Sequence, residues 1–349
     1  MRSPVILKMK NLSKLQKIMN LLIQLAIFLV TYLFIYQEVF QKTDLSGVML
    51  TIENDMLNPE FQIGLLLVIF LMFVNWSVEA YKWKFLIGKV EEVSFFKALQ
   101  AVLTGISVSS FIPNRVGEFF GRIFILKTAS RIEGILITVV GSMSQLLITI
   151  LAGSFALLIF IPGYLSNAGF SHGYLYHSLV ILVLSLNVLL VAMFFKLSFL
   201  NTLKERILRN GLKRLRKFFR IFAFYQNREM AIVMLLSFTR YLVFTTQFYL
   251  LLILFDVRIP YLNALVLIPI IYLIMAIIPT IALTELGVRG SVALYVFGLY
   301  FGNFLPLTGE IYFGVFAAST LLWLINLGIP ALIGTIFVFR LQFFRKKNS

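Results

Sequence analysis

Six predominantly apolar segments, each long enough to cross a lipid bilayer, constrain the fold of this chain more than any other feature. They cover residues 18–36, 61–80, 133–161, 175–195, 230–255 and 311–338, and about 20 apolar residues suffice for a transmembrane helix. Charged residues make up only 13% of the chain, about half of their share in soluble domains. We therefore predict an all-α polytopic membrane protein, with residues 1–349 as a single membrane domain.

Basic residues alternate between the connecting segments, which predicts the orientation of the chain. The first 17 residues carry five basic side chains and residues 196–228 carry ten, whereas residues 37–62 carry five acidic side chains and one lysine. We also assign Lys82 and Lys84 to a basic connector that follows the second span. Because basic loops remain in the cytoplasm, both termini are predicted to be cytoplasmic. The net charge of +16 then reflects topology rather than nucleic-acid binding.

Two further regions, residues 96–130 and 261–304, each consist of two short apolar pieces separated by proline, glycine and charge. Loop charge places the chain on the same side before and after each region, so each forms a re-entrant hairpin or two short spans. The order span, span, hairpin, span then occurs twice, over residues 17–162 and 174–340. Because each half crosses an odd number of times, we predict an inverted repeat, in which broken segments mark a transport site near the midplane.

The two broken regions share a short motif. The first contains IPNRVGEFFGR and the second contains IPTIALTELGVRG. Each has Ile-Pro followed by Glu-x-x-x-Arg, which pairs Glu118 with Arg122 and Glu285 with Arg289. Proline ends a helix, and glycine allows the chain to turn back. Structural roles in the hairpins are therefore assigned to Pro113, Gly117, Pro279 and Gly287.

Each Glu-x-x-x-Arg pair places a carboxylate in the first turn of a helix and a guanidinium on the same face. One interpretation is that the two charges only neutralise each other and hold the hairpin together. The other is that the arginine binds the phosphate of a lipid headgroup, since a guanidinium can donate two parallel hydrogen bonds to phosphate. Arg115 has no acidic partner at helical spacing and either contacts phosphate or extends to the membrane surface.

Arg240 lies within the fifth span, where a charge costs roughly 2.5–3.5 kcal/mol on insertion scales. It therefore requires a partner or a wet cavity. Thr239, Thr246 and Gln247 are predicted to face the bundle interior beside it, and the third span carries a similar stripe of Ser142, Gln145 and Thr149. Hydrogen-bonded helix packing is the alternative for these small polar residues. The candidate substrate-binding residues are Asn114, Arg115, Glu118, Arg122, Arg240, Glu285 and Arg289.

Residues 202–225 are predicted to form a cytoplasmic amphipathic helix. Its apolar residues recur at helical spacing, and its other face carries Arg206, Arg209, Lys213, Lys217 and Arg220. This pattern is typical of a helix that lies on an anionic membrane surface. An ordinary basic loop is the alternative.

Composition argues against several kinds of chemistry. The chain has no cysteine, and its two histidines are His172 and His177, so thiolate and histidine-rich metal sites are excluded. It also lacks a phosphate-binding loop and a nucleophile motif. We predict no metal, no cofactor and no catalytic residue, and whether the protein is an enzyme stays open.

The segments FIPNRVGEFFGRIFILK and IPTIALTELGVRGS resemble the flippase-like transmembrane domain of bacterial lysylphosphatidylglycerol synthetases and its stand-alone relatives. Gly117, Glu118 and Arg122 match the first family motif, whereas residues 282–284 differ from the glycine-rich approach to the second glutamate. The resemblance implies a lipid flippase-like protein of the bacterial inner membrane. The sequence contains no aminoacyltransferase domain, so lysyl transfer is not predicted.

The leading hypothesis is translocation of a phospholipid or a polyprenyl-phosphate-linked lipid through a midplane groove lined by both hairpins. Membrane lipids with phosphate headgroups are the expected partners, and nucleic acid is not. The alternative is a membrane-embedded lipid-binding enzyme, or the partner of a glycosyltransferase, that binds lipid without moving it. A small-solute secondary transporter is a third hypothesis.

Overall fold

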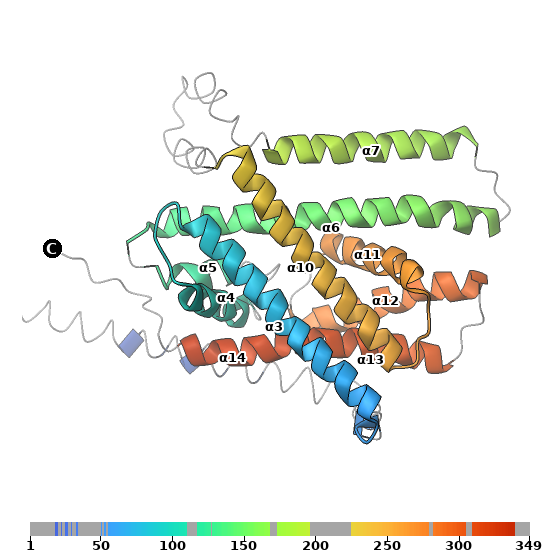
Figure 1. Ribbon diagram of the computed structural model, residues 1–349, viewed down its shortest axis with the longest axis horizontal. Helices are drawn as coiled ribbons and strands as arrows, with labels where there is room; N and C mark the ends of the chain where they lie inside the picture. Colours follow the sequence, from blue (N-terminus) through green and yellow to red (C-terminus); the bar gives the residue numbers. More distant parts are fainter. Residues whose placement is uncertain are drawn as a thin grey trace, which may run out of the picture.

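The structure, a computed structural model, describes residues 55–109, 117–126, 128–167, 173–195, 225–278, 282–304 and 309–338, with a few residues between 18 and 53. These parts of the chain contain helices and no strand (Figure 1). Five described helical stretches are long and apolar enough to cross a membrane: Pro59–Ile87, Arg131–Gly163, Tyr176–Phe195, Asn227–Leu254 and Gly309–Val338. The prediction of an all-α polytopic membrane protein is confirmed.

The helices that contain these stretches are α3 (Pro59–Ile87), α6 (Arg131–Asn167), α7 (Tyr174–Phe195) and α10 (Asn227–Leu254). The fifth stretch consists of α13 (Gly309–Trp323), one turn of π-helix at Leu324–Gly328 and α14 (Ile329–Val338). In the predicted span at 18–36, the few described residues are helical, and the rest lie outside the described residues. The predicted interfacial helix, with its five basic residues, also lies outside them.

Each broken region forms two helices. The first gives α4 (Phe95–Ser109) and α5 (Gly117–Ile123), and the second gives α11 (Tyr261–Ile277) and α12 (Ala282–Phe304). The 7 residues of α5 extend about 10 Å, far less than the roughly 30 Å of a bilayer core. The described part of the first hairpin therefore returns without α5 crossing the membrane, whereas the 23 residues of α12 are long enough to cross.

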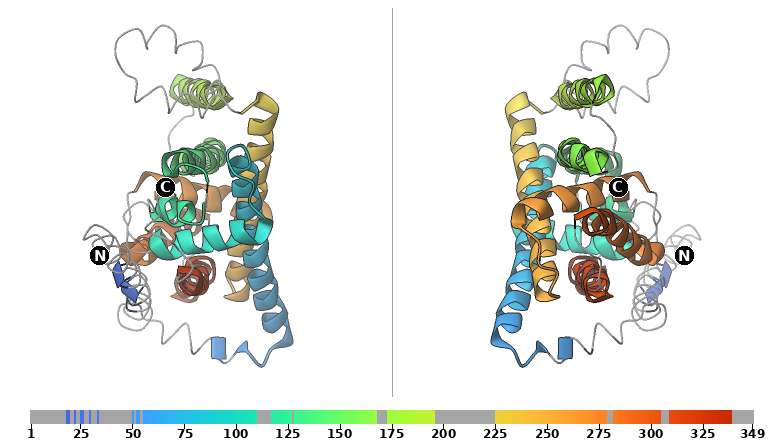
Figure 2. Two further views of the ribbon diagram at one scale, coloured as in Figure 1. Left: turned by 90° about the vertical axis from the view of Figure 1, so that its left-hand side faces the viewer. Right: turned by 90° about the vertical axis from the view of Figure 1, so that its right-hand side faces the viewer.

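The long helices run in two directions. Seen from either end of the molecule, α6, α7 and α13–α14 are viewed nearly along their axes, while α3 and α10 cross them obliquely on one side (Figure 2). α3 packs along α10, and α6 packs against both α10 and α11. The α4–α5 hairpin lies toward one end of the bundle and α11–α12 toward the other (Figure 1). The bundle interior is therefore approached by one hairpin from each end.

Glycine allows the first hairpin to pack at backbone distance. A Cβ atom at Gly121 of α5 would collide with the backbone of Gly105 on α4, and one at Gly117 would lie 2.6 Å from the Cα of Ser109. α14 packs on the opposite side of α4, where Gly334 leaves no room for a side chain against Leu103 and Ser107. α4 is thus held between α5 and α14.

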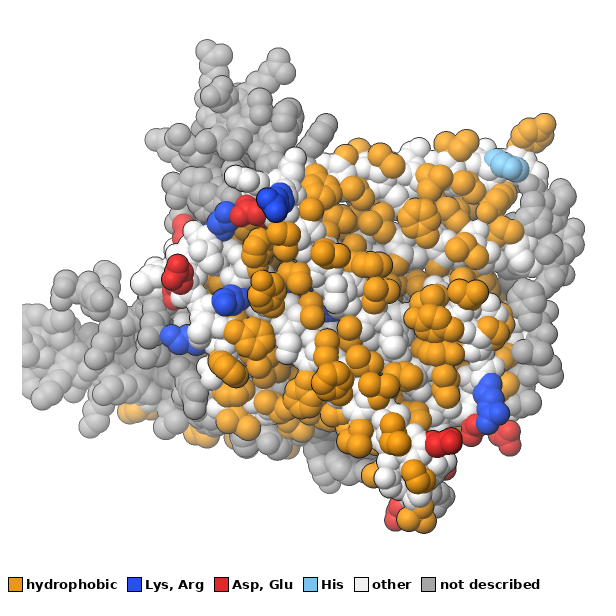
Figure 3. All heavy atoms as spheres, in the orientation of Figure 1, with side chains coloured by type: hydrophobic (Ala, Val, Ile, Leu, Met, Phe, Trp, Pro, Cys, Tyr) orange, Lys and Arg blue, Asp and Glu red, His pale blue; other side chains and the backbone are white. Residues whose placement is uncertain are grey.

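The surface is mostly apolar across the middle of the molecule. Hydrophobic side chains cover the centre of the face shown in Figure 3, and most charged side chains lie near its two ends. α7 is largely covered by exposed leucine, isoleucine and valine side chains, including Ile181, Leu182 and Val188. This distribution fits a lipid-facing belt between two polar ends, because apolar surface is not penalised in a bilayer.

Candidate functional site

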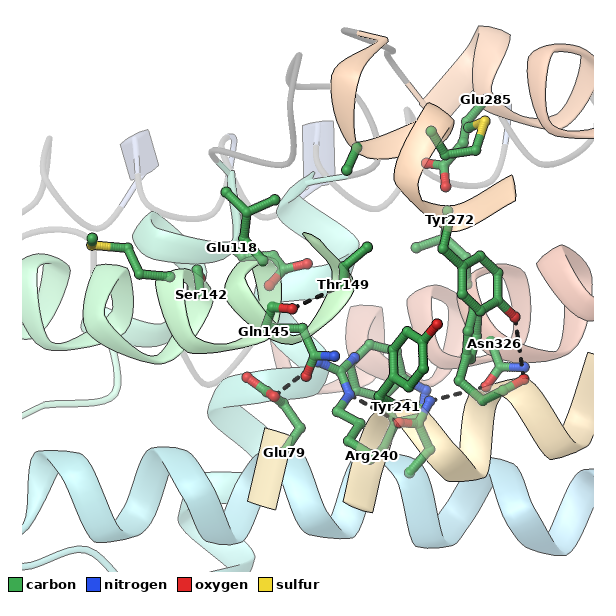
Figure 4. A pocket seen from close by; sticks show the side chains of 18 of the residues that line it. Glu79, Glu118, Ser142, Gln145, Thr149, Arg240, Tyr241, Tyr272, Glu285 and Asn326 are labelled. Atoms are coloured by element: carbon green, nitrogen blue, oxygen red, sulfur yellow. Dashed lines mark hydrogen bonds and ion pairs between the residues drawn. The ribbon is translucent and has the colours of Figure 1, made fainter. Parts of the chain in front are cut away.

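The two hairpins contribute to one cavity of about 730 Å³ inside the bundle (Figure 4). Glu118 and Phe119 come from the start of α5, while Ile278, Glu285 and Arg289 come from the second hairpin. Side chains of α3, α6, α10, α13 and the π-helix complete the lining. The volume is within the usual range for ligand pockets, roughly 300–1,000 Å³. The structure therefore brings two segments far apart in the sequence to one site.

Glu79 of α3 is the centre of the polar network beside this cavity. Its Oε1 lies 2.8 Å from Arg122 Nη1, and its Oε2 lies 2.8 Å from Lys82 Nζ and 2.9 Å from Arg240 Nη1. The Glu79 side chain is only 5% exposed. Three cations from three different helices thus share one buried carboxylate. These ion pairs offset part of the free-energy cost of burying charge in a low-dielectric region.

The position of this network follows from the length of α3. Asn75, Glu79 and Lys82 are spaced four and three residues apart, so they share one face of the helix. α3 continues to Ile87, and Lys82 is buried, donating to Gly141 O at 3.2 Å and to Ser237 Oγ at 3.3 Å. Our assignment of Lys82 and Lys84 to a connector after the second span was therefore wrong. Glu79 was not identified from the sequence as a site residue. Asn75, four residues before it, and Lys82, three residues after it, share its helix face and were a usable signal.

Arg122 of the first hairpin bridges two carboxylates. It donates from Nη1 to Glu79 and from Nη2 to Glu118 Oε2 at 2.9 Å, and its side chain is 3% exposed. The predicted pair with Glu118 is therefore formed, but a second partner comes from α3. Since both terminal nitrogens are occupied by carboxylates, Arg122 serves to fasten α5 to α3.

Arg240 of α10 is held by α3 but remains accessible. Besides Glu79, it donates from Nε to Asn75 Oδ1 at 2.9 Å and lies 4.8 Å from the centre of the Trp76 ring. Asn75 donates in turn to Asn326 Oδ1 of the π-helix at 3.2 Å. The Arg240 side chain is 19% exposed. The predicted need for partners inside the membrane is met, and the guanidinium still lines the cavity.

At the second hairpin, Arg289 has one described carboxylate partner. Its Nη2 donates to Glu285 Oε1 at 2.7 Å, and the guanidinium lies 5.8 Å from the centre of the Phe244 ring. Arg289 Nε and Nη1 are buried and have no hydrogen-bond partner among the described residues. Unpaired buried donors are costly, so Arg289 has hydrogen-bonding capacity that no described residue uses.

Other polar residues also line the cavity, besides the Glu79 network and the pair of Glu285 with Arg289. Ser142, Gln145 and Thr149 of α6 do so as one stripe, and the Tyr241 hydroxyl, buried beside them, has no partner among the described residues. The stripe on α10 was only partly correct. Gln247 is buried and donates to Val68 O, but Thr239 is exposed and bonds within its own helix.

The remaining candidate residues divide into two groups. Pro113, Asn114, Arg115 and Pro279 lie outside the described residues. Gly117 is packed against α4, whereas a Cβ atom at Gly287 would meet no described residue within 4 Å. The structure therefore supplies a packing reason for glycine at the first hairpin but none at Gly287.

The charges and hydrogen-bond donors around the cavity indicate which kind of ligand it can bind. Among the described residues, four cations (Lys82, Arg122, Arg240 and Arg289) line or support it against three carboxylates (Glu79, Glu118 and Glu285). No group of three described histidine, aspartate or glutamate side chains is placed to hold a metal ion. The site can accept a group with negative charge and multiple hydrogen-bond acceptors, such as a phosphate.

These features define a multi-pass membrane protein with a cavity between two hairpins, lined by apolar residues and by a set of charged and polar side chains. A family profile for the lysylphosphatidylglycerol synthase TM region matches residues 21–303. The match covers most of the chain, and the protein belongs to this family. The comparisons with curated proteins and with solved structures returned no match. The resemblance stated from the sequence motifs is therefore confirmed at the level of the family, and a lipid-related membrane function follows from it.

Proposed function

We propose that the cavity binds the phosphate of a membrane lipid and that the protein moves this lipid between leaflets. The observation that carries the proposal is the meeting of both hairpins at one cavity, lined by three cations and three carboxylates and supported by a fourth cation, Arg122, that is buried behind Glu79 and Glu118. A lipid phosphate would offset the excess positive charge. Phospholipids and polyprenyl-phosphate-linked lipids both supply this group.

Two arginines are the proposed ligands of the phosphate. Arg240 is the most exposed of the three cations around Glu79, and Arg289 has N–H groups without a described partner. Arginine suits this role because its planar guanidinium can donate two parallel hydrogen bonds to phosphate oxygens. Arg115 and Asn114 remain proposed contacts near the first tip.

The arrangement of the hairpins supports an alternating-access mechanism. α4–α5 and α11–α12 lie toward opposite ends of the bundle (Figure 1), as expected for an inverted repeat with cytoplasmic termini. In such transporters, one half moves relative to the other around a fixed site. We propose that each hairpin controls access from one leaflet of a bacterial inner membrane, and that the basic segment at 202–225 attracts anionic lipid.

Lipid exchange between leaflets of proteoliposomes tests this function. Fluorescent phospholipid is incorporated into both leaflets, and dithionite reduces only the outer pool, so translocation raises the reduced fraction. We expect wild-type protein to raise it, and Arg240→Gln and Arg289→Gln each to slow exchange by roughly tenfold or more, as for loss of one charged contact worth about 1.5–3 kcal/mol. The control is Arg258→Gln, because Arg258 is 86% exposed and pairs only with Asp256 among the described carboxylates.

Two results would contradict translocation. Exchange equal to that of protein-free liposomes excludes it for the lipids tested, and exchange unchanged in both cavity variants excludes the proposed route. Lipid binding without exchange would instead favour the alternative, a lipid-binding enzyme or glycosyltransferase partner.

A further inference from the structure

We propose that Glu79 is a built-in competitor of the ligand, since its carboxylate occupies the position on Arg240 that a phosphate oxygen would take. This inference rests on the proposed function of the cavity as a phosphate site. It assigns to Glu79, a residue of α3 outside both hairpins, control over how tightly the site holds an anion.

The ion pairs around Glu79 are unequal in a way that permits exchange. Glu79 has three cationic partners, whereas Arg240 has Glu79 as its one described carboxylate partner. If Arg240 moves from Glu79 to a ligand, Lys82 and Arg122 still compensate the carboxylate. Removing the partner of a buried charge is strongly destabilising because that charge is left uncompensated, and the two remaining cations limit this cost for Glu79.

Exposure identifies Arg240 as the cation that exchanges. Its side chain is 19% exposed, compared with 3% for Arg122 and 1% for Lys82. Arg240 lines the cavity together with Glu79, so a ligand phosphate can approach the guanidinium from the open side. Arg122, enclosed by two carboxylates, offers no comparable edge.

Two contacts hold the Arg240 guanidinium in place while its carboxylate partner changes. Nε donates to Asn75 Oδ1, and the ring of Trp76 lies 4.8 Å from the guanidinium carbon. Neither contact involves Nη1, the atom that binds Glu79. The arginine can thus exchange an internal carboxylate for a phosphate with little reorientation.

Competition by Glu79 has a functional consequence. A site that passes its ligand across a membrane must bind it strongly enough to admit it and weakly enough to release it. An internal carboxylate that reoccupies Arg240 lowers the affinity and assists release. Replacing Glu79 by a neutral isostere is therefore expected to tighten binding, the opposite of the usual effect of removing a residue from a binding site.

The test compares Glu79→Gln with Glu118→Gln by titration calorimetry in a nonionic detergent. Glu118 is the matched control because it is also a cavity carboxylate 2.9 Å from Arg122 but has no described contact with Arg240. Dihexanoylphosphatidic acid and inorganic phosphate are the two probes, so lipid phosphate and free phosphate are distinguished. We expect Glu79→Gln to raise the affinity for the lipid probe about tenfold and Glu118→Gln by less than about threefold, because a direct competitor outweighs a remote charge.

A double-mutant cycle decides whether the effect passes through Arg240. In an Arg240→Gln background, the gain from Glu79→Gln should disappear. Equal gains in the two single variants, a loss of affinity in Glu79→Gln, or a gain that persists without Arg240 would overturn the proposal. Absence of binding to both wild type and Glu79→Gln would also overturn it. A larger gain for inorganic phosphate than for the lipid probe would overturn the assignment to a lipid.

Folding and transport are separated from the affinity measurement. Each variant is first checked for a monodisperse peak in size-exclusion chromatography. If Glu79→Gln fails this check, the double variant Glu79→Gln/Lys82→Met is used in its place, because it removes one negative and one positive charge together. The same affinity criteria apply to it. Tighter binding with no lipid exchange in any variant would uphold the role of Glu79 and refute translocation.

Discussion

The two hairpins carry the same Glu-x-x-x-Arg motif, yet their arginines have different surroundings. Arg122 donates to Glu118 and also to Glu79 of α3, whereas Arg289 has Glu285 as its one described carboxylate partner. The glycines of the two hairpins also differ, because α5 packs on α4 through Gly121, whereas no described residue lies within 4 Å of a Cβ atom placed at Gly287. The first hairpin is thus fastened to α3 and leaves only Arg122 Nε without a described partner, whereas both Nε and Nη1 of Arg289 lack one.

The largest effect is expected in thiol labelling, which reports the side of the membrane on which each hairpin begins. The chain has no cysteine, so Glu92→Cys before α4 and Arg258→Cys before α11 each carry a single thiol. A membrane-impermeant maleimide should label Arg258→Cys in intact cells and Glu92→Cys only after the membrane is opened, because the hairpins start from opposite sides. Labelling of both positions from outside would contradict the predicted inverted repeat.

The next largest effect is a difference in the free energy of unfolding between variants of Arg122 and of Arg289. Arg122→Gln removes the one described cationic partner of Glu118 and one of the three partners of Glu79, so we expect a loss of about 3–5 kcal/mol, the cost of breaking a buried ion pair. Arg289→Gln should cost roughly half as much, because one carboxylate is involved. Thermal unfolding of the purified proteins in detergent measures both. Similar losses for the two variants would show that Glu79 does not fasten the first hairpin.

The glycines offer a matched comparison with a smaller effect. Gly121→Ala forces α5 away from α4 and should destabilise the protein by about 1–3 kcal/mol, as overpacking does. Gly287→Ala adds a methyl group in open space within a helix and should be neutral or stabilise the protein by up to about 1 kcal/mol. The same unfolding measurement applies, and a destabilised Gly287→Ala would mean that this tip is closed.

The smallest effect is expected at the ring beside Arg289. Phe244→Leu removes an aromatic face 5.8 Å from the guanidinium and should cost roughly 0.5–1 kcal/mol. Phe238→Leu is the control, since Phe238 is an exposed residue on the same helix. Equal shifts in unfolding temperature for both variants would indicate that the ring does not stabilise Arg289.

Hydropathy and helix-breaking residues predicted much of the fold. Five of the six predicted spans correspond to described helices, and both broken regions form helix pairs. These features are local, since a long apolar stretch needs no partner to be recognised as a transmembrane helix. The same local logic found the pairs Glu118 with Arg122 and Glu285 with Arg289, whose members lie one helical turn apart.

The central role of Glu79 could not be found in this way. Its partners Arg122 and Arg240 are 43 and 161 residues away, so their association depends on how α3, α5 and α10 pack. A glutamate and a lysine near the end of an apolar stretch resemble the polar boundary of a span, which is why Lys82 was placed in a connector. Asn326 was missed for a related reason, because its position depends on a π-turn that hydropathy does not reveal.

That π-turn has a consequence for chain length. Its extra residue per turn shifts the phase of the helix, and one residue corresponds to about 100° of rotation. Asn326 bonds to Asn75 within the turn, and Gly334 packs on α4 beyond it. Deleting a single residue from Leu324–Gly328 would rotate α14 by more than a quarter turn relative to α13 and move Gly334 away from α4. The length of this short segment, beyond the part of the chain that matches the family, therefore sets the alignment of the cavity with the first hairpin.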